Sequence, residues 1–224
     1  MRPLDIAYMW ELVPVIAGYI PLTLFMAVIA MAAALVLAAL LAVVRVLRIP
    51  VVDRVVAVFI SFFRGTPLLV QLFLFYYGLP QMLSFLTSID GVTAAIFGLT
   101  LHFSAYMAES IRGAILGVDR SQWEAAQSIG MTRGQLLRRI ILPQAARVAA
   151  PTLMNYFIDM IKSTSLAFTL GVTEMMGAAQ KEAAGSFLYL EAFLLVALFY
   201  WAIVEVLSVG QRRMERHLGK AVAR

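Results

Sequence analysis

The stretch that decides the fold is EAAQSIGMTRGQLLRRIILP, residues 124–143, a polar segment between two very apolar regions. Three arginines lie in its second half, and a segment with so many charges is not expected to cross a bilayer. Gly130 offers a backbone position that can adopt a left-handed helix cap, so we predict that a first helix ends there and that a second begins at Thr132 or nearby. Pro143 is predicted to break the chain before the next membrane segment.

The first half of this stretch carries small residues on a helical face. Trp123, Ala126, Gln127 and Gly130 fall at helical spacing, so Ala125 and Ala126 are expected to leave a smooth surface that a concave partner can approach closely. The alternative is an interfacial helix whose arginines hold lipid head groups. Spacing alone leaves both interpretations open.

Composition places the whole chain in the membrane class. Of 224 residues, 62% are hydrophobic and 14% are charged, and the mean hydropathy is +0.87, which is too apolar for an ordinary soluble domain. The net charge of +5 does not indicate nucleic acid, because the basic residues flank apolar runs and act there as topology determinants. The absence of cysteine excludes disulfides, thiolate metal sites and cysteine nucleophiles. Residues 1–14 lack the features of a cleaved signal peptide and are expected to be retained.

The apolar runs predict one all-α integral membrane domain with about five spans. Pro14 and Pro21 indicate that the first span is entered through a turn or a short interfacial piece. Thr66 followed by Pro67 predicts that a helix restarts within the second span, with the threonine hydroxyl as N-cap. The expected spans are residues 18–44, 55–86, 92–116, 148–171 and 187–209, with a cytoplasmic loop at residues 117–146.

Basic residues set the expected orientation. Fourteen of the eighteen lysines and arginines lie in three regions, residues 45–54, 112–147 and 212–224, which alternate with regions poor in positive charge. The positive-inside rule assigns the three regions to the cytoplasm. The N-terminus is then outside, the C-terminus is cytoplasmic, and the loop that contains residues 124–143 is cytoplasmic.

Polar residues inside the fourth apolar region are candidates for a translocation path. Asn155, Asp159, Lys162 and Ser163 fall at i, i+4, i+7 and i+8 and therefore form one stripe along a helix. An ionisable side chain that faces lipid at mid-bilayer costs roughly 2.5–3.5 kcal/mol, so the stripe should face a bundle interior or a water-filled path. The alternative is that Asp159 and Lys162 pair with each other or clamp a neighbouring helix.

Other polar residues lie near the ends of the apolar regions. Arg64 and Thr66 are further candidates for the substrate path, since they lie with exposed amides at a predicted helix start and can meet a carboxylate. The alternative for Arg64 is snorkelling to the membrane interface. His102 is expected to make an interhelical hydrogen bond rather than to bind metal, and Glu109 and Arg112 are expected to form a local ion pair.

No enzymatic site emerges from the sequence. The chain lacks the G-x-x-x-x-G-K-[ST] phosphate cradle, and its histidine and carboxylate spacings do not form a metal site. We therefore expect no cofactor on this chain. Any ATP must be bound by a partner subunit.

Residues 124–143 also match a known pattern, in which Glu-Ala-Ala is followed after three residues by Gly, after nine more by Ile, and after one more by Leu-Pro. This pattern resembles the EAA loop of the membrane subunits of ABC importers. The matching residues are Glu124, Ala125, Ala126, Gly130, Ile140, Leu142 and Pro143. The resemblance implies that these residues couple the chain to an ATPase.

Further segments resemble the polar amino acid branch of the MetI-like permeases over about residues 18–201. These segments are RGTPLLVQLFLFYYGLP at 64–80, AYMAESIRGAI at 105–115, LPQAARVAAPTLMNYFIDMIKSTSL at 142–166, and Thr173-Glu174-Met175. In this branch many relatives carry Asp where this chain has Ser163, so this chain lacks the carboxylate of those relatives at this position. Residues 175–183 faintly resemble importers of cystine and related amino acids.

The resemblance implies a multi-pass subunit of a bacterial inner-membrane importer. Its expected partners are a second permease subunit, identical or paralogous, an ABC ATPase dimer, and an extracytoplasmic amino-acid-binding protein that docks near Leu79–Asp90 and Glu174–Ser186. A secondary transporter that works without ATP is an alternative, although the chain shows no inverted repeat. A non-transporting scaffold is another, although it would not need a polar stripe.

Overall fold

The computed structural model describes residues 4–222, and over this range the chain is helical without a β-strand. Its α-helices are α1 Ile6–Ala17, α2 Ile20–Leu47, α3 Val52–Gly65, α4 Leu68–Phe73, α5 Gly91–Leu116, α6 Arg120–Ser128, α7 Arg133–Leu136, α8 Leu142–Ser163, α9 Met175–Ser186 and α10 Tyr189–Val222. Short π or 3-10 turns are η1 Leu74–Gly78, η2 Leu79–Gln81, η3 Ser84–Leu86, η4 Leu137–Ile141 and η5 Thr164–Leu170.

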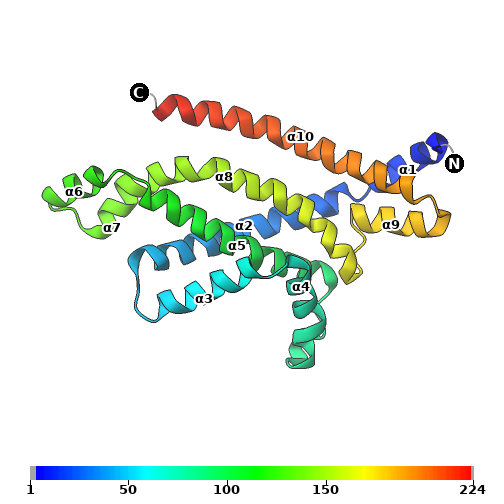
Figure 1. Cartoon of the computed structure of the whole chain (residues 1–224), viewed down its shortest axis with the longest axis horizontal. Helices are drawn as coiled ribbons and strands as arrows, with labels where there is room; N and C mark the ends of the chain where they lie inside the picture. The colour runs from blue at the N-terminus through cyan, green and yellow to red at the C-terminus, as the bar shows by residue number, and fades with distance from the viewer. Residues whose placement is uncertain (1–3, 223–224) are drawn as a thin grey trace.

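The long helices run along one axis of the molecule. Figure 1 shows α2, α3, α5, α8 and α10 in this direction, with α6, α7 and the C-terminal end of α10 at one end and the N-terminus and α9 at the other. The helix α4 turns away from the bundle. The α6–α7 loop therefore lies at the opposite end of the bundle from α9.

Three helices of the described chain are long and apolar enough to cross a membrane: α2, α5, and α10 over residues 189–217. A fourth span is added if α3 and residues 68–81, which meet at a bend of 111°, are taken together. The predicted fourth span corresponds to α8, which is outside this set and carries several polar residues, among them Arg147, Asp159 and Lys162. The five-span count therefore stays a prediction.

The contact between α2 and α5 is built from small side chains. Buried residues recur at every fourth position of α2, where one helical face returns to the same side, and four of the five are alanines. Because an alanine side chain is a single methyl group, the two helix backbones approach closely, and the hydroxyl of Thr100 on α5 donates to the Ala30 carbonyl at 3.5 Å. The α2 residues are Met26, Ala30, Ala34, Ala38 and Ala42.

The bend between α3 and α4 is held by a buried glutamine. Nε2 of Gln71 donates to the carbonyl oxygens of Phe63 and Thr66 at 3.0 and 3.1 Å. These two acceptors lie at the end of α3 and in the bend that follows it. Its Oε1 accepts from Nδ1 of His102 on α5 at 3.0 Å. The predicted interhelical hydrogen bond of His102 is thereby confirmed, and the structure identifies Gln71 as its partner.

The helix restarts after Thr66 as predicted, but the expectation that Thr66 is its N-cap is wrong. The N-cap is Pro67, without a side-chain hydrogen bond. The Thr66 hydroxyl instead donates to the Phe62 carbonyl at 2.8 Å and accepts from Gln71 Nε2 at 2.8 Å. It therefore satisfies the last turn of α3 rather than the first turn of α4.

The expected break at Pro143 is also wrong. Helical structure continues from Arg133 to Ser163 through α7, η4 and α8, and Pro143 lies in the first turn of α8. Proline lacks an amide hydrogen, and its ring clashes with the carbonyl four residues earlier, so it disrupts a regular α-helix. The π turn η4, directly before α8, widens the helix where this disruption falls.

At the opposite end, a buried carboxylate joins three helices. Glu174 is 0% exposed and accepts hydrogen bonds from the Gly177 amide at 2.9 Å, the Tyr200 hydroxyl at 2.7 Å and the Thr23 hydroxyl at 3.3 Å. These donors lie on α9, α10 and α2. The segment expected as a docking loop, Glu174–Ser186, is therefore the helix α9 and its cap, packed into the bundle.

The alanine contact makes a prediction about stability. We expect Ala34→Leu to lower the free energy of unfolding by about 1–3 kcal/mol, because Ala34 is 0% exposed and the larger side chain must push α2 away from α5. Thermal unfolding of the purified chain, followed by circular dichroism in detergent, measures the change. The matched control is Ala33→Leu, since Ala33 is exposed on the same helix. Equal melting temperatures for the two variants would contradict the close packing.

Candidate functional site

The α6–α7 loop begins with a capped helix. The carboxylate of Asp119 accepts a hydrogen bond from the Ser121 amide at 2.7 Å at the N-terminus of α6. Hydrogen bonds from Ser121 hold the pKa of Asp119 below its usual range. The charged carboxylate also lies favourably at the positive end of the helix dipole. The helix α6 is therefore fixed at its start by its own sequence.

The turn between α6 and α7 has the predicted form. Gly130 has φ +77, the left-handed conformation that favours glycine, and a Cβ atom there would meet nothing within 4 Å. Thr132 then caps α7 in a capping box: its hydroxyl accepts from the Gln135 amide at 3.4 Å, and the Gln135 side chain accepts from the Thr132 amide at 3.0 Å. Backbone conformation, rather than lack of space, thus calls for glycine at this position.

The two alanines of the loop face opposite ways. Ala126 is 2% exposed and belongs to a buried cluster with Ile115 of α5, Leu136 of α7 and Ile141 of η4. Ala125 is exposed. The expectation that both alanines form the outer surface is therefore wrong for Ala126, which anchors the loop to the ends of the long helices.

The remaining residues of the matched pattern lie on the outside of the loop or on the helix beyond it. Glu124 pairs with Arg120 at 3.2 Å, and their side chains are 68% and 91% exposed. So exposed a pair adds little stability, which leaves the Glu124 carboxylate free to meet a partner. Leu142 and Pro143 are exposed and Ile140 is half-buried.

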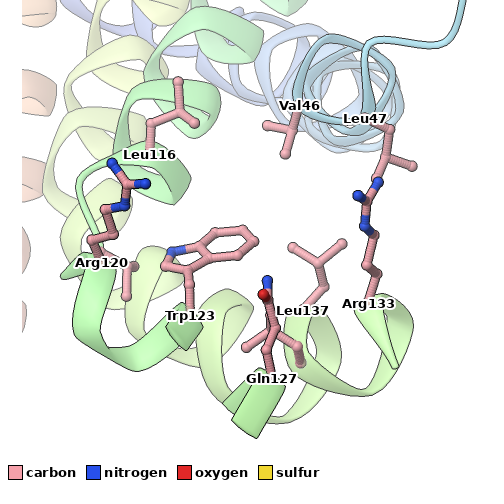
Figure 2. Close-up of a pocket in the computed structure, with 10 residues that line it drawn as sticks. Val46, Leu47, Leu116, Arg120, Trp123, Gln127, Arg133 and Leu137 are labelled. Carbon is pink, nitrogen blue, oxygen red and sulfur yellow. The ribbon is translucent and has the colours of Figure 1, made fainter. Parts of the chain in front are cut away.

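A cavity of about 460 Å³ lies behind the loop, and the sequence did not reveal it. Its walls come from segments far apart in the chain, the C-terminal ends of α2 and α5 and the helices α6 and α7 with η4. Figure 2 shows the side chains that line it, with the Trp123 ring among them. The lining residues are Val46, Leu47, Leu116, Val118, Arg120, Trp123, Gln127, Arg133, Leu136 and Leu137.

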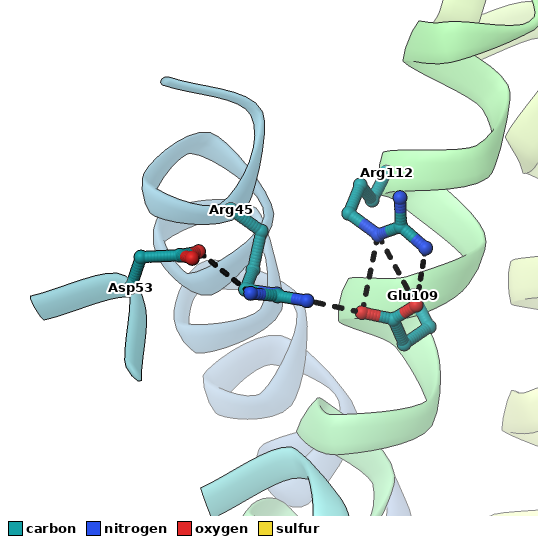
Figure 3. Close-up of polar contacts among 4 residues, drawn as sticks. All are labelled: Arg45, Asp53, Glu109 and Arg112. Carbon is teal, nitrogen blue, oxygen red and sulfur yellow. Dashed lines mark hydrogen bonds and ion pairs between the residues drawn. The ribbon is translucent and has the colours of Figure 1, made fainter. Parts of the chain in front are cut away.

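Beside the loop, four charged residues join α2, α3 and α5 (Figure 3). Arg45 Nη1 lies 2.7 Å from Asp53 Oδ1, and Arg112 Nη2 lies 2.7 Å from Glu109 Oε2, which confirms the predicted pair on α5. Arg45 Nε is buried and 4.0 Å from Glu109 Oε1, without a hydrogen-bond partner among the described residues. The network thus links α2 and α3 by charge attraction to α5, the helix that leads into the α6–α7 loop.

The polar stripe on α8 does not face the interior of this chain's own bundle. Asp159 Oδ1 and Lys162 Nζ pair at 2.6 Å, as the alternative interpretation held, and their side chains are 52% and 54% exposed. Ser163 donates to the Asp159 carbonyl at 2.8 Å, and Asn155 accepts from Gln211 of α10 at 2.9 Å. The stripe therefore lies on the outside of the chain.

Two tyrosines connect Arg64 with α8. The Arg64 guanidinium carbon lies 5.5 Å from the centre of the Tyr106 ring, whose hydroxyl donates to the Arg64 carbonyl at 3.3 Å. The Tyr106 ring lies 6.2 Å from the Tyr156 ring on α8, and the Tyr156 hydroxyl is hydrogen-bonded to Ser110 at 3.0 Å. Tyr106 and Tyr156 thus connect Arg64 with α8, the helix that carries the polar stripe. We had not predicted a role for either tyrosine.

Comparison with known proteins identifies the class of this fold. The family described as "Binding-protein-dependent transport system inner membrane component" matches residues 34–220. The chain is 59% identical to the probable amino-acid ABC transporter permease protein PatM of Vibrio harveyi, covering 98% of this chain and 99% of that protein. It is 36% identical to the glutamine transport system permease protein GlnP of Escherichia coli (strain K12), covering 96% and 97%.

Solved structures agree with this result. A chain from the crystal structure of an amino acid ABC transporter with histidines superposes with a TM-score of 0.88 at 31% identity, covering 96% of this chain and 100% of that chain. An inward-facing MetNI methionine ABC transporter chain has the same fold, with a TM-score of 0.79 at 18% identity. These matches confirm the resemblance to the MetI-like permeases. The chain therefore belongs to the family of inner membrane components of binding-protein-dependent transport systems.

Proposed function

We propose that this chain is the permease subunit of an ATP-driven importer, and that it forms the path for a polar amino acid delivered by an extracytoplasmic binding protein. The observation that carries the proposal is the α6–α7 loop, a capped and outward-facing helix at one end of a bundle that matches amino-acid permeases over nearly its whole length. Such a helix is a suitable docking site for a separate ATPase subunit, since the sequence of this chain contains no phosphate-binding motif.

The loop is built to transmit force into the long helices. Its outer face carries Glu124 and Ala125, while Ala126 on the inner face packs into the cluster at the ends of α5, η4 and α8. Packed side chains transmit displacement because interiors are dense. An ATPase dimer that closes on ATP would thereby move α5 and α8 together, opening and closing the path by alternating access.

The exposed stripe on α8 supports a second permease subunit, either a copy or a paralogue. A charged pair that is half-exposed on one chain would face lipid at a cost of several kcal/mol if nothing covered it. A second permease that covers α8 would enclose Asn155, Asp159, Lys162 and Ser163 between the two chains. The substrate path is then a shared interior rather than the interior of one bundle.

The charges of the stripe suit an amino acid. A zwitterion needs a cation for its carboxylate and an anion for its ammonium group, and Lys162 and Asp159 supply both within one turn. Arg64 supplies a second cation on the neighbouring face. Thr66 contributes indirectly, since its hydroxyl holds the bend of α3 and α4 through Phe62 and Gln71.

The remaining partners follow from the orientation. We place the α6–α7 loop and the C-terminus in the cytoplasm and the N-terminus outside, in agreement with the distribution of basic residues. The binding protein would then meet residues 79–90, where Met82 and Phe85 are 83% and 71% exposed, and the surface of α9.

Glu124→Lys tests the dock. We expect the variant to lose the ATPase subunit that co-purifies with the tagged wild-type chain in mild detergent, because the substitution reverses a charge on the exposed face of α6. Mass spectrometry of the purified complex identifies and quantifies the ATPase. Gln122→Lys is the matched control, since it adds a positive charge on the same exposed helix outside the matched pattern and should retain the ATPase. If the ATPase subunit co-purifies equally with both variants, the proposed contact at Glu124 is wrong.

Gly130→Val tests the geometry of the turn. Valine at φ +77 is strained by about 1–2 kcal/mol, so we expect the α6 helix to lose its angle and uptake to fall at least tenfold, with membrane insertion unchanged. Uptake and ATP hydrolysis by proteoliposomes measure the coupling. Gly130→Asn is the control, because asparagine tolerates the left-handed conformation and should keep most of the activity. Loss of insertion in the valine variant would make the turn a folding element instead.

A charge exchange separates transport from packing on α8. We expect Asp159→Asn and Lys162→Gln each to reduce amino-acid uptake at least tenfold while the ATPase still co-purifies. The double exchange Asp159→Lys with Lys162→Asp restores an ion pair. We expect the ATPase to co-purify with this variant as well, but uptake to stay low, since the substrate then meets the charges in reverse order. If the exchange restores uptake, the pair is structural only.

A further inference from the structure

The cavity behind the α6–α7 loop has an apolar wall that continues the surface of two membrane helices. Val46 and Leu47 come from the end of α2, and Leu116 from the end of α5. Leu47 and Leu116 leave 43% and 58% of their surface exposed, although they line a cavity within the chain. Apolar surface that stays exposed to water in a hollow is unfavourable, and such surface commonly marks a binding site. The cavity therefore favours an apolar occupant on the side of the membrane helices.

The rest of the lining is polar and positive. Arg120 and Arg133 extend from opposite sides, with Trp123, Gln127 and Leu137 between them (Figure 2). No aspartate or glutamate of the described chain lines the cavity. Among the described residues, Arg120 pairs with the Glu124 carboxylate at 3.2 Å, and a pair so exposed is weak enough for another anion to replace it. The Arg120 side chain is 91% exposed, so its guanidinium group lies at the rim of the cavity, where it can bind an anionic group such as a phosphate.

These two features together describe an amphiphile with an anionic head. We propose that an anionic phospholipid of the leaflet next to the α6–α7 loop occupies this cavity, with its phosphate between Arg120 and Arg133 and the first part of an acyl chain against Val46 and Leu116. A tryptophan at the boundary of head group and chain, here Trp123, suits this position. The proposal goes beyond the transport function, since it makes the packing of the α6–α7 loop on the bundle depend on the lipid composition of one leaflet.

The occupant would fill the cavity between α6 and the ends of α2 and α5. With the lipid in place, a displacement of α6 would pass to both helices through continuous contacts. Without it, the displacement would pass only through the Ala126 side of the loop. The lipid would therefore act as a packing element of the transmission.

Trp123 itself provides the measurement. The full chain with Trp10→Phe and Trp201→Phe retains Trp123 as its one tryptophan, and the two replaced side chains are exposed, at 71% and 62%. The protein is placed in bilayer nanodiscs with increasing fractions of either phosphatidylglycerol or phosphatidylcholine whose chains carry bromine near the glycerol. Bromine quenches tryptophan at contact, so the quenching curve gives the relative affinity of the cavity for each lipid. We expect phosphatidylglycerol to bind at least tenfold more tightly.

Charge variants decide the result. We expect Arg120→Gln and Arg133→Gln each to reduce the preference about fivefold, and the lysine replacements at the same positions to retain most of it. Arg138→Gln with Arg139→Gln is the matched control, because these exposed arginines lie in the same stretch but do not line the cavity. Circular dichroism shows whether each variant is folded.

Three results would overturn the proposal. They are equal quenching by the two lipids, a preference unchanged in a folded variant that lacks both cavity arginines, and an equal loss of preference in the Arg138 and Arg139 control. Equal and weak quenching would mean that protein or water fills the cavity. Loss of the lipid preference leaves the co-purification of the ATPase as a separate question, so the two ideas fail independently.

Discussion

The close packing of α2 on α5 through alanines is the contact on which the rest of the structure depends. The residues Ala30, Ala34 and Ala38 are completely buried, so the two longest central helices lie side by side with little between them. At one end this arrangement brings Arg45 to Glu109 and forms one wall of the cavity. At the other end it presents Thr23 of α2 to the buried Glu174 at the start of α9. Helix association in a membrane gains little from the hydrophobic effect, so small side chains that allow many contacts at short distance have an outsized effect.

Polar groups inside the bundle are used to fix local geometry. The buried Gln71 holds the bend of α3 and α4 and reaches His102 on α5, so the irregular backbone of the bend is supported on both sides. Glu174 does the same for the start of α9, where its carboxylate accepts from three donors. Because unsatisfied polar groups are costly away from water, each cluster specifies one arrangement of its helices.

The α6–α7 loop has a well-defined local structure but packs on the bundle through few side chains. Its left-handed turn at Gly130 and its helix start at Thr132 are local, which explains why the sequence predicts them. The cap at Asp119 is local too, although we had not predicted it. Its attachment to the bundle depends instead on Ala126, on the cluster around it, and on what fills the cavity next to Trp123. A partner that grips the outer face and a lipid that fills the inner one would act on the same short helix from opposite sides.

The sequence alone determined the membrane class, the family resemblance, the turn at Gly130 and the start of α7 at Thr132, because these depend on composition and on neighbours within a few residues. It also placed the polar stripe on one face of α8, since helical spacing is fixed. Only the tertiary structure decided that this stripe lies outside the chain's own bundle, that Ala126 faces inward, that the helix continues through Pro143, and that Arg120 and Arg133 share a cavity with the ends of α2 and α5. The physical reason is that each of these outcomes depends on which helices pack together, and residues far apart in the chain settle that.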